Sequence, residues 1–313
     1  MMNNTSISRT LSAVILVSLA FLHSSCRDEP RETPTQGTLA MISSEDVSPV
    51  IDLQVTDFTR AYTGAVITHR HSSARDAVVQ LLNDSVKLIV IPREFNDEER
   101  RVIAKNELDV TSTLIAYDAV AVVVNEGNRL TQVTTAQLRS FLDGSVTSWS
   151  AVPGSGLTGQ VVVAMGEPNS AVSEYVKQRL NGGREFAPVV LPGATTADVI
   201  ADVQKRRNAV GFVPQAWLKG LPESLRVLEV GDPAFRRDTT GTAMEFFAPH
   251  QAYIHQGLYA MRRSVYVHTH NAGRGVALGF TSFAAAAEGQ KIIVKNGLVP
   301  ATMPVRLVQL SQQ

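Results

Sequence analysis

Apolar and polar positions alternate along the chain in short blocks that predict strands followed by helices. Thr38 to Ile42 is an apolar run, and after four polar residues the apolar positions of 47–62 recur at helical spacing until Gly64. The same strand, loop and helix return with a predicted strand at 65–68 and a helix that begins near Ser72. The pattern therefore predicts repeated strand–helix units.

Further strands and helices follow in the same order. The run 119–124 (AVAVVV) is wholly apolar, as expected of a strand that is covered on both faces. This alternation predicts an α/β fold with largely parallel sheets. The other predicted strands are 87–91, 161–165, 189–191 and 209–213, and the other predicted helices begin near Asn96, Thr134, Ser170 and Thr195.

Composition narrows the classes of function. The 313 residues include 29 Lys+Arg and 29 Asp+Glu, so the formal net charge is zero. Because no basic stripe is available to neutralise a phosphate backbone, we expect no nucleic-acid partner. A single cysteine cannot form an internal disulfide or a cysteine-based zinc site, so stability must come from a buried core. The length suggests two compact units.

The first 25 residues predict an export signal. The apolar run Leu11 to Leu22 is shorter than the roughly 20 residues that a membrane-spanning helix needs. Cys26 follows two serines, which is similar to the cleavage box of bacterial lipoproteins and implies that Cys26 is lipidated. The alternative is a plain signal peptide beside a chance cysteine. The polar segment 26–37 predicts a tether, so we expect an exported chain, anchored by lipid on the periplasmic side of a bacterial membrane.

Hydroxyl and amide side chains gather in the predicted strand-to-helix loops. Open α/β sheets bind ligands at these loops, where helix N-termini present free N–H groups. Each such residue taken alone is an ordinary helix cap, but several that converge could hold a small oxyanion, with Arg75 and Arg93 adding charge-assisted bonds. The loop residues concerned are Ser43, Ser44, Ser72, Ser73, Asn169 and Ser170.

Other motifs for chemistry are few. Residues 154–159 (GSGLTG) fit the spacing of a dinucleotide-binding loop, but they precede a strand, so we interpret them as a turn. The pairs His69/His71 and His268/His270 could each ligate a metal from one strand face. Without a neighbouring cysteine or paired acid, we interpret them as half-exposed strand histidines. We predict no metal site, no cofactor and no enzymatic activity, because no nucleophile–base pair is evident.

Several ordered segments resemble one known family. They are 115–125 (IAYDAVAVVVN), 138–144 (LRSFLDG) with Ser148-Trp149, 209–213 (AVGFV), 257–266 (GLYAMRRSVY), and Gly279-Phe280, 288–290 and 297–300. Together they resemble the PstS-like phosphate-binding proteins, the extracytoplasmic components of phosphate ABC transporters. The resemblance covers about residues 37–310.

This resemblance implies a two-lobe type II periplasmic-binding-protein fold. Each lobe would be a mostly parallel sheet flanked by helices, with two hinge crossings near 117–118 and 212–213. Residues 38–117 and 213–313 would form lobe I, and residues 118–212 would form lobe II. The resemblance further implies a monomer that captures inorganic phosphate, or a related oxyanion, between the lobes and delivers it to ABC transporter permease subunits.

The ligand loops depart from the family pattern. Ser43-Ser44-Glu45-Asp46 replaces Gly-Ser-Ser-Thr, and Ser170-Ala171-Val172 replaces a Ser-Gly-Thr that follows an arginine. Glu45 or Asp46 could accept the proton of monohydrogen phosphate, which sulfate lacks at neutral pH. Equally, both acids could repel an anion. Two alternatives therefore stay open: a scaffold that has lost tight anion binding and serves signalling or protein interaction, and a phosphatase-like enzyme.

Overall fold

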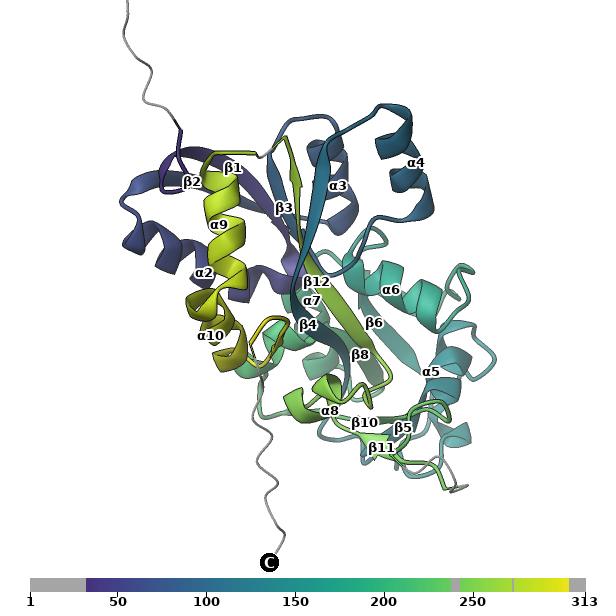
Figure 1. Ribbon diagram of the computed structural model, residues 1–313. Helices are drawn as coiled ribbons and strands as arrows, with labels where there is room; N and C mark the ends of the chain where they lie inside the picture. The colour runs from purple at the N-terminus through teal and green to yellow at the C-terminus, as the bar shows by residue number, and fades with distance from the viewer. Residues whose placement is uncertain (1–31, 238–242, 272, 304–313) are drawn as a thin grey trace, which may run out of the picture. The chain divides into compact units, whose positions relative to one another are not determined.

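A ten-stranded sheet runs through the computed structural model, which describes residues 32–237, 243–271 and 273–303 (Figure 1). The strand order is β2-β1-β3-β12-β4-β8-β6-β7, and β9 and β13 pair with β4. The three strands at each end are parallel to one another, whereas β12 and β4 in the middle run antiparallel to their neighbours. The predicted mixture of strands and helices with parallel sheets is confirmed.

One end of the sheet contains the first three strands. β1 (Gln36–Ser44) lies between β2 (Gly64–Ser72) and β3 (Leu88–Ile91), and the connections are α2 (Ser48–Ala61) and α3 (Ala74–Leu82). The last residue of β1 pairs with the last residue of β2. The loops that follow both strands therefore emerge at the same edge of the sheet.

The other end repeats this arrangement. β6 (Val162–Gly166) lies between β7 (Val190–Gly193) and β8 (Ala209–Pro214), and α6 (Ala171–Arg179) and α7 (Thr196–Lys205) connect them. Because the last residues of β6 and β7 are paired, α6 and α7 also begin at a common edge.

A single long strand joins the two ends. β4 (Val110–Asn125) has 16 residues; its first part pairs with β12 (Arg262–His270) and β13 (Val299–Pro300), and its second part pairs with β8 and β9 (Leu225–Val227). All six residues of the run 119–124 are fully buried. The prediction of a strand covered on both faces is confirmed there.

The remaining elements flank this sheet. Asn96 and Thr134 form capping boxes at the starts of α4 and α5, as their predicted positions imply. The remaining helices are α4 (Asp97–Lys105), α5 (Thr135–Leu142), α8 (Gln251–His255), α9 (Val276–Ala285) and α10 (Ala287–Lys295); short 3-10 segments are η1 (Glu45–Val47), η2 (Trp149–Ala151) and η3 (Gln215–Gly220); and β5 (Gln132–Thr134), β10 (Glu229–Gly231) and β11 (Phe246–Phe247) form a small second sheet.

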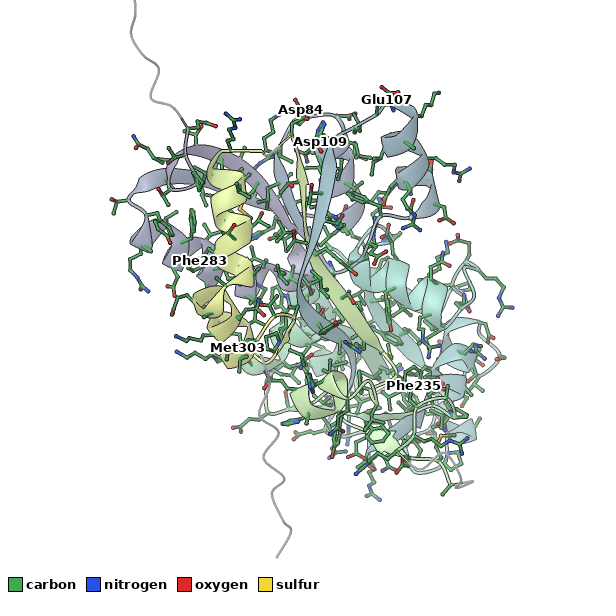
Figure 2. All side chains as sticks on the ribbon, viewed as in Figure 1. Asp84, Glu107, Asp109, Phe235, Phe283 and Met303 are labelled. Atoms are coloured by element: carbon green, nitrogen blue, oxygen red, sulfur yellow. The ribbon has the colours of Figure 1, made fainter. Side chains whose placement is uncertain are left out.

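Aromatic packing holds α2 against α9. Phe58 of α2 lies edge-on to Phe280 and Phe283 of α9, with ring centroids 5.7 and 5.5 Å apart (Figure 2 labels Phe283). Burial of one such side chain stabilises a fold by roughly 1.5–3 kcal/mol.

Two helices end in the left-handed conformation. Asp84 follows α3 and Glu107 follows α4, with φ of 58° and 50° (Figure 2), the conformation that ends many helices.

The histidines of β12 differ from the sequence prediction. His268 and His270 are buried rather than half-exposed, because β12 lies inside the sheet between β3 and β4. The neutral imidazole of His268 is satisfied on both sides, by the Ser112 hydroxyl at Nδ1 (2.7 Å) and the Arg93 carbonyl at Nε2 (3.1 Å). By contrast, the predicted turn at 154–159 is confirmed, since it forms a loop before β6 with three glycines at positive φ.

The predicted signal peptide 1–25 and Cys26 lie outside the described residues. β1 begins at Gln36, within the segment 26–37 predicted as a tether. Among the described residues, every helix is too short or too polar to cross a membrane. The lobe boundaries at 117–118 and 212–213 stay predictions, and they fall within β4 and β8.

Candidate functional site

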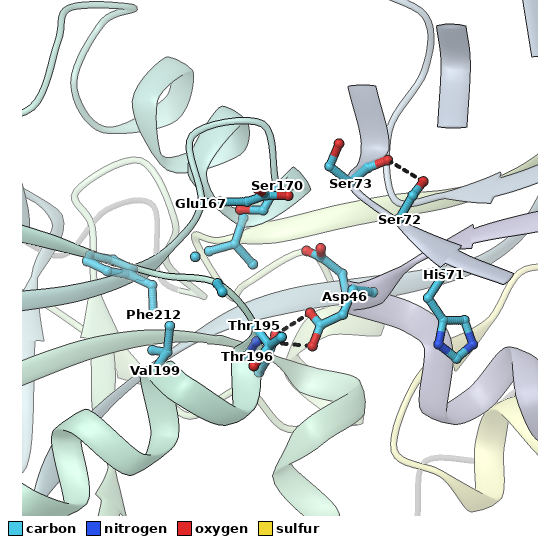
Figure 3. Close-up of a pocket in the computed structure, with 14 residues that line it drawn as sticks. Asp46, His71, Ser72, Ser73, Glu167, Ser170, Thr195, Thr196, Val199 and Phe212 are labelled. Atoms are coloured by element: carbon cyan, nitrogen blue, oxygen red, sulfur yellow. Dashed lines mark hydrogen bonds between the residues drawn. The ribbon is translucent and has the colours of Figure 1, made fainter. Parts of the chain in front are cut away.

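A cavity of about 350 Å³ lies between residues that belong to the parallel strands β1, β2 and β3 with their loops and residues that belong to β6, β7 and β8 with theirs (Figure 3). Its walls come from the loops that follow β1, β2, β6 and β7. Val172, Val199 and Phe212 give it an apolar side. The residues that line it are Glu45, Asp46, His71, Ser72, Ser73, Gly166, Glu167, Ser170, Val172, Ala194, Thr195, Thr196, Val199 and Phe212.

Three helices begin at this cavity. The hydroxyl oxygen of Ser73 accepts a hydrogen bond from the Asp76 N–H at the start of α3 (3.2 Å). Ser170 caps α6 and Thr195 caps α7 in the same way, each at 3.2 Å. The first N–H groups of a helix have no partner within the helix, and the helix dipole favours negative charge there. This convergence of helix N-termini suits a small anion.

A carboxylate already occupies the start of α7. The N–H of Thr196 donates to Oε1 of Glu45 (3.0 Å), and the Thr196 hydroxyl donates to Oε2 (2.6 Å). Burial raises the pKa of Glu45, although the two bonds from Thr196 oppose this shift. Glu45 thus joins η1, at one wall of the cavity, to α7 at the other.

Asp46 is paired with a buried arginine, Arg263. Nη1 of Arg263 donates to Oδ2 of Asp46 (2.8 Å), and Nη2 donates to Asp118. All three side chains are at most 3% exposed. Burial raises the pKa of Asp118, against the pull of Arg263. Because two carboxylates share one guanidinium, the trio carries a net negative charge when both acids are ionised.

The charged groups of the cavity wall are mostly acids. Glu45, Asp46 and Glu167 contribute carboxylates, and His71 is the one basic side chain among the lining residues of the described chain. A ligand must therefore be held by hydroxyls, helix N–H groups and dipoles, rather than by a direct contact with lysine or arginine. Such a wall favours an anion that can donate a proton.

Half of the ten residues predicted to bind ligand line the cavity: Glu45, Asp46, Ser72, Ser73 and Ser170. The structure places three others elsewhere. Oγ of Ser43 is hydrogen-bonded to Nε2 of His69 (2.9 Å), and Asn169 is exposed outside the lining. Oγ of Ser44 is buried, with no hydrogen-bond partner among the described residues.

The two predicted cationic donors also lie away from the cavity. Both terminal nitrogens of Arg93 donate to Glu99 at 2.8 Å, and its Nε donates to Glu174 at 2.8 Å. These carboxylates satisfy the guanidinium, so it is not available to a ligand in this arrangement. Arg75 lines a separate hollow of about 200 Å³, which also includes Glu99 and Glu174. A role for either arginine in ligand binding stays a prediction.

Sequence reasoning missed part of the wall. Thr195 and Thr196 open a helix directly after a predicted strand, so the rule that selected Ser72 and Ser170 would have selected them as well. Glu167 follows β6 by one residue and gave no separate signal. The contact between Glu45 and Thr196 joins positions 151 apart and has no local signature.

Comparison with known proteins agrees with this architecture. The family model of the PBP superfamily domain matches residues 28–288. The phosphate-binding protein PstS of Borreliella burgdorferi is 18% identical over 298 residues, which cover 93% of this chain and 98% of that protein.

Solved structures of similar proteins share the fold. One, from Clostridium perfringens, is described as a phosphate ABC transporter substrate-binding protein with bound phosphate; its TM-score is 0.72 at 16% identity, covering 85% of this chain and 100% of that one. An ABC-type phosphate transport receptor from Vibrio cholerae gives a TM-score of 0.65 at 18% identity, with coverage of 85% and 100%. The predicted type II periplasmic-binding-protein fold is confirmed. On its family match and its fold, the chain belongs to the PBP superfamily, as the resemblance to PstS-like phosphate-binding proteins implies.

Proposed function

We propose that this chain captures inorganic phosphate, or a closely related oxyanion, in the cavity and delivers it to the permease of an ABC transporter. The observation that carries the proposal is the convergence of the N-termini of α3, α6 and α7 on one hollow lined by hydroxyls. The similar proteins from Borreliella, Clostridium and Vibrio are described as phosphate-binding or phosphate-transport proteins, which supports it. No reaction on the ligand is required.

The donors in this proposal are neutral. The hydroxyls of Ser72, Ser73 and Ser170 and the first N–H groups of α3 and α6 would surround the phosphate oxygens, while the N–H of Thr196 at the start of α7 stays bonded to Glu45. Oδ2 of Asp46 is engaged by Arg263 (2.8 Å), which positions the carboxylate at the cavity. Its other oxygen would accept the proton of monohydrogen phosphate. Sulfate has no such proton, so its oxygen at this position would be repelled by the Asp46 carboxylate.

Ligand release would require the walls to separate. One wall comes from the segment predicted as the first part of lobe I, and the other comes from the predicted lobe II, residues 118–212. Hinge bending at 117–118 and 212–213 would open the cavity, as in other two-lobe binding proteins. The Glu45–Thr196 contact would then be made only in the closed form.

The same proposal includes export and anchoring. Cleavage before Cys26 and lipidation of that cysteine would hold a monomer on the periplasmic side of the membrane, with 26–37 as its tether. A Cys26→Ser variant should move from the membrane fraction to the soluble fraction of the cell. Retention of that variant on the membrane would count against lipid anchoring and would leave the cavity proposal untouched.

Delivery is tested by uptake of labelled phosphate in cells that lack this gene. Restoring the wild-type chain should restore uptake, and Ser72→Ala, which removes a cavity hydroxyl, should restore less. Ser85→Ala is the matched control, because Ser85 is exposed and does not line the cavity. Equal uptake with and without the gene would contradict the transport role.

One observation favours a second candidate function. Three carboxylates line the cavity, while Arg93 is already paired with Glu99 and Glu174. A scaffold that has lost tight anion binding and instead serves signalling or protein interaction would show this charge balance. Saturable phosphate binding by the purified protein would exclude it.

A further inference from the structure

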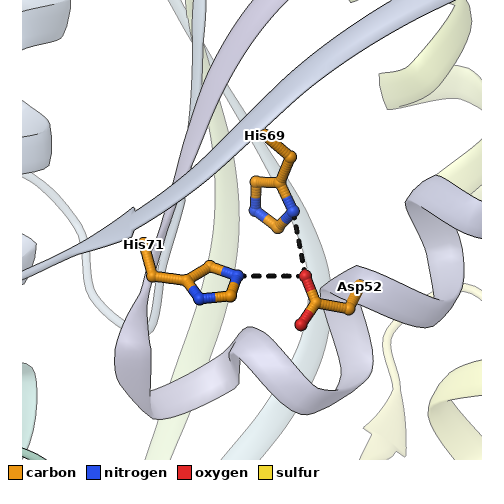
Figure 4. A group of neighbouring side chains, drawn as sticks. All are labelled: Asp52, His69 and His71. Carbon is orange, nitrogen blue, oxygen red and sulfur yellow. Dashed lines mark hydrogen bonds and ion pairs between the residues drawn. The ribbon is translucent and has the colours of Figure 1, made fainter.

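A cluster of two histidines and one aspartate lies on the face of β2 that α2 covers. Nδ1 of His69 and Nε2 of His71 are each 3.0 Å from Oδ1 of Asp52 (Figure 4). The three side chains offer one ligand atom each, and these atoms all lie within 4.8 Å of one another. All three side chains therefore point to a common centre.

The fold explains why these residues meet. Residues two apart on a strand project from the same face, so His69 and His71 are neighbours on β2. β2 is the edge strand of the sheet, and α2 packs beside it and brings Asp52 over this face. The sequence near the two histidines contains no paired acid. The fold supplies one, because Asp52 comes from the preceding helix, α2.

The spacing of these atoms suits a metal ion. Zinc bound at about 2.0–2.1 Å to nitrogen and oxygen ligands in a tetrahedron sets those ligands roughly 3.3 Å apart. The two nitrogen–oxygen separations of 3.0 Å are close to that value. Imidazole nitrogen and carboxylate oxygen are both ligands of divalent zinc and of its neighbours in the transition series.

A hydrogen bond from Ser43 holds one of the ligands in place. The side chain of His69 is 8% exposed, and its other ring nitrogen, Nε2, is hydrogen-bonded to Oγ of Ser43 (2.9 Å). Metal-bound histidines are commonly oriented by such a bond from the ring nitrogen that faces away from the metal. Asp52 and His71 are 49% and 41% exposed, so an ion can reach the site from solvent.

We propose that Asp52, His69 and His71 form a site for a divalent transition metal of the zinc type, with a fourth position open to water. The site is separate from the proposed phosphate contacts, except that His71 also lines the cavity. A cation here would add positive charge beside a wall whose other charged groups are carboxylates. The metal site does not depend on whether phosphate is the ligand.

The test is titration of the purified, chelator-treated protein with Zn²⁺ in competition with a chromophoric chelator, in phosphate-free buffer. The wild type should bind one equivalent of Zn²⁺. Asp52→Asn and His71→Ala each alter a ligand atom, so each should weaken that binding by at least the roughly 10–100-fold that loss of a residue orienting a ligand produces. Asp57→Asn, on the same helix, and His255→Ala, an exposed histidine on α8, are the matched controls and should bind as the wild type does.

Thermal melts of the same variants show whether each variant is folded. At a Zn²⁺ concentration below the Kd expected for His71→Ala but above that of the wild type, Zn²⁺ should raise the melting temperature of the wild type and both controls and should raise that of His71→Ala clearly less. Absence of saturable Zn²⁺ binding by the wild type, or equal affinity in a folded His71→Ala, would overturn the proposal. Because no phosphate is present, neither result bears on the transport function.

Discussion

Glu45 and Thr196 are 151 positions apart in the chain, and both oxygens of the glutamate accept hydrogen bonds from the threonine, at 3.0 and 2.6 Å. The carboxylate therefore occupies the N-terminus of α7, which is one of the places where an anionic ligand would bind. Glu45 acts as a tethered anion at the cavity wall.

Replacing Glu45 with glutamine should tighten phosphate binding. The amide keeps an acceptor for Thr196 but removes one negative charge from the cavity, so we expect the Kd to fall by about tenfold, or about 1.4 kcal/mol. Calorimetric titration measures the change, and Glu126→Gln, an exposed acid elsewhere, should have no effect. Weaker binding by Glu45→Gln would show instead that Glu45 accepts the proton of the ligand.

Arg263 should be the most sensitive charged residue for stability. It is 1% exposed at its side chain and is shared by Asp46 and Asp118, so Arg263→Ala would leave two buried carboxylates without a counter-charge. We expect a loss of about 3–5 kcal/mol in the free energy of unfolding, measured by urea denaturation. Arg60→Ala, which breaks an exposed pair with Asp57, should cost about 1 kcal/mol or less. Equal stability of the two variants would contradict this account of the trio.

Gly279 should not tolerate a side chain. A Cβ at this position of α9 would lie 1.8 Å from the carbonyl oxygen of Pro34, which precedes β1. Backbone rather than a flexible side chain would have to move, so Gly279→Ala should lose about 1–3 kcal/mol. Gly220→Ala, whose Cβ would meet no atom within 4 Å, should stay within about 0.5 kcal/mol of the wild type. A wild-type urea midpoint for Gly279→Ala would contradict the contact.

His268 should make the fold sensitive to acid. Burial lowers the pKa of His268 from 6.5 to about 4, so the native state binds fewer protons than the unfolded state between these values. The fold therefore gains stability from neutral His268 above pH 6.5. This gain is lost as the pH falls from 6.5 through 4, by up to about 3 kcal/mol.

The comparison of wild type with His268→Gln isolates this effect, because Glu45, Glu174 and Asp118, whose pKa values burial raises, titrate in both proteins. Urea midpoints at pH 7.5 and pH 4.5 should differ less in the variant than in the wild type. His255→Gln, at an exposed position, should keep the wild-type difference. A variant with the full wild-type pH dependence would rule out His268 as its source.

Local pattern was sufficient for much of the fold. The helix starts at Asn96, Thr134, Ser170 and Thr195 were predictable, because capping depends on residues three or four positions away. The loops that contain Glu45, Ser72 and Ser170 were selected from the sequence in the same way, and they form three walls of the cavity.

Contacts between distant residues were not predictable in this way. Arg263 and Asp46 are 217 positions apart, and their pairing depends on the order of strands in the sheet. Arg93 was a reasonable candidate for an anion contact on its position after β3, but Glu99 and Glu174 take its donors. The burial of His268 likewise follows from the insertion of β12 between β3 and β4.

The most direct test of the central claim is calorimetric titration of the purified protein with phosphate and then with sulfate at neutral pH. Bound ligand would first be removed by mild unfolding and refolding. The account predicts saturable phosphate binding with a Kd of about 1 μM or tighter, equivalent to about −8 kcal/mol, and no heat with sulfate. Absence of both heat and thermal stabilisation with millimolar phosphate would contradict it.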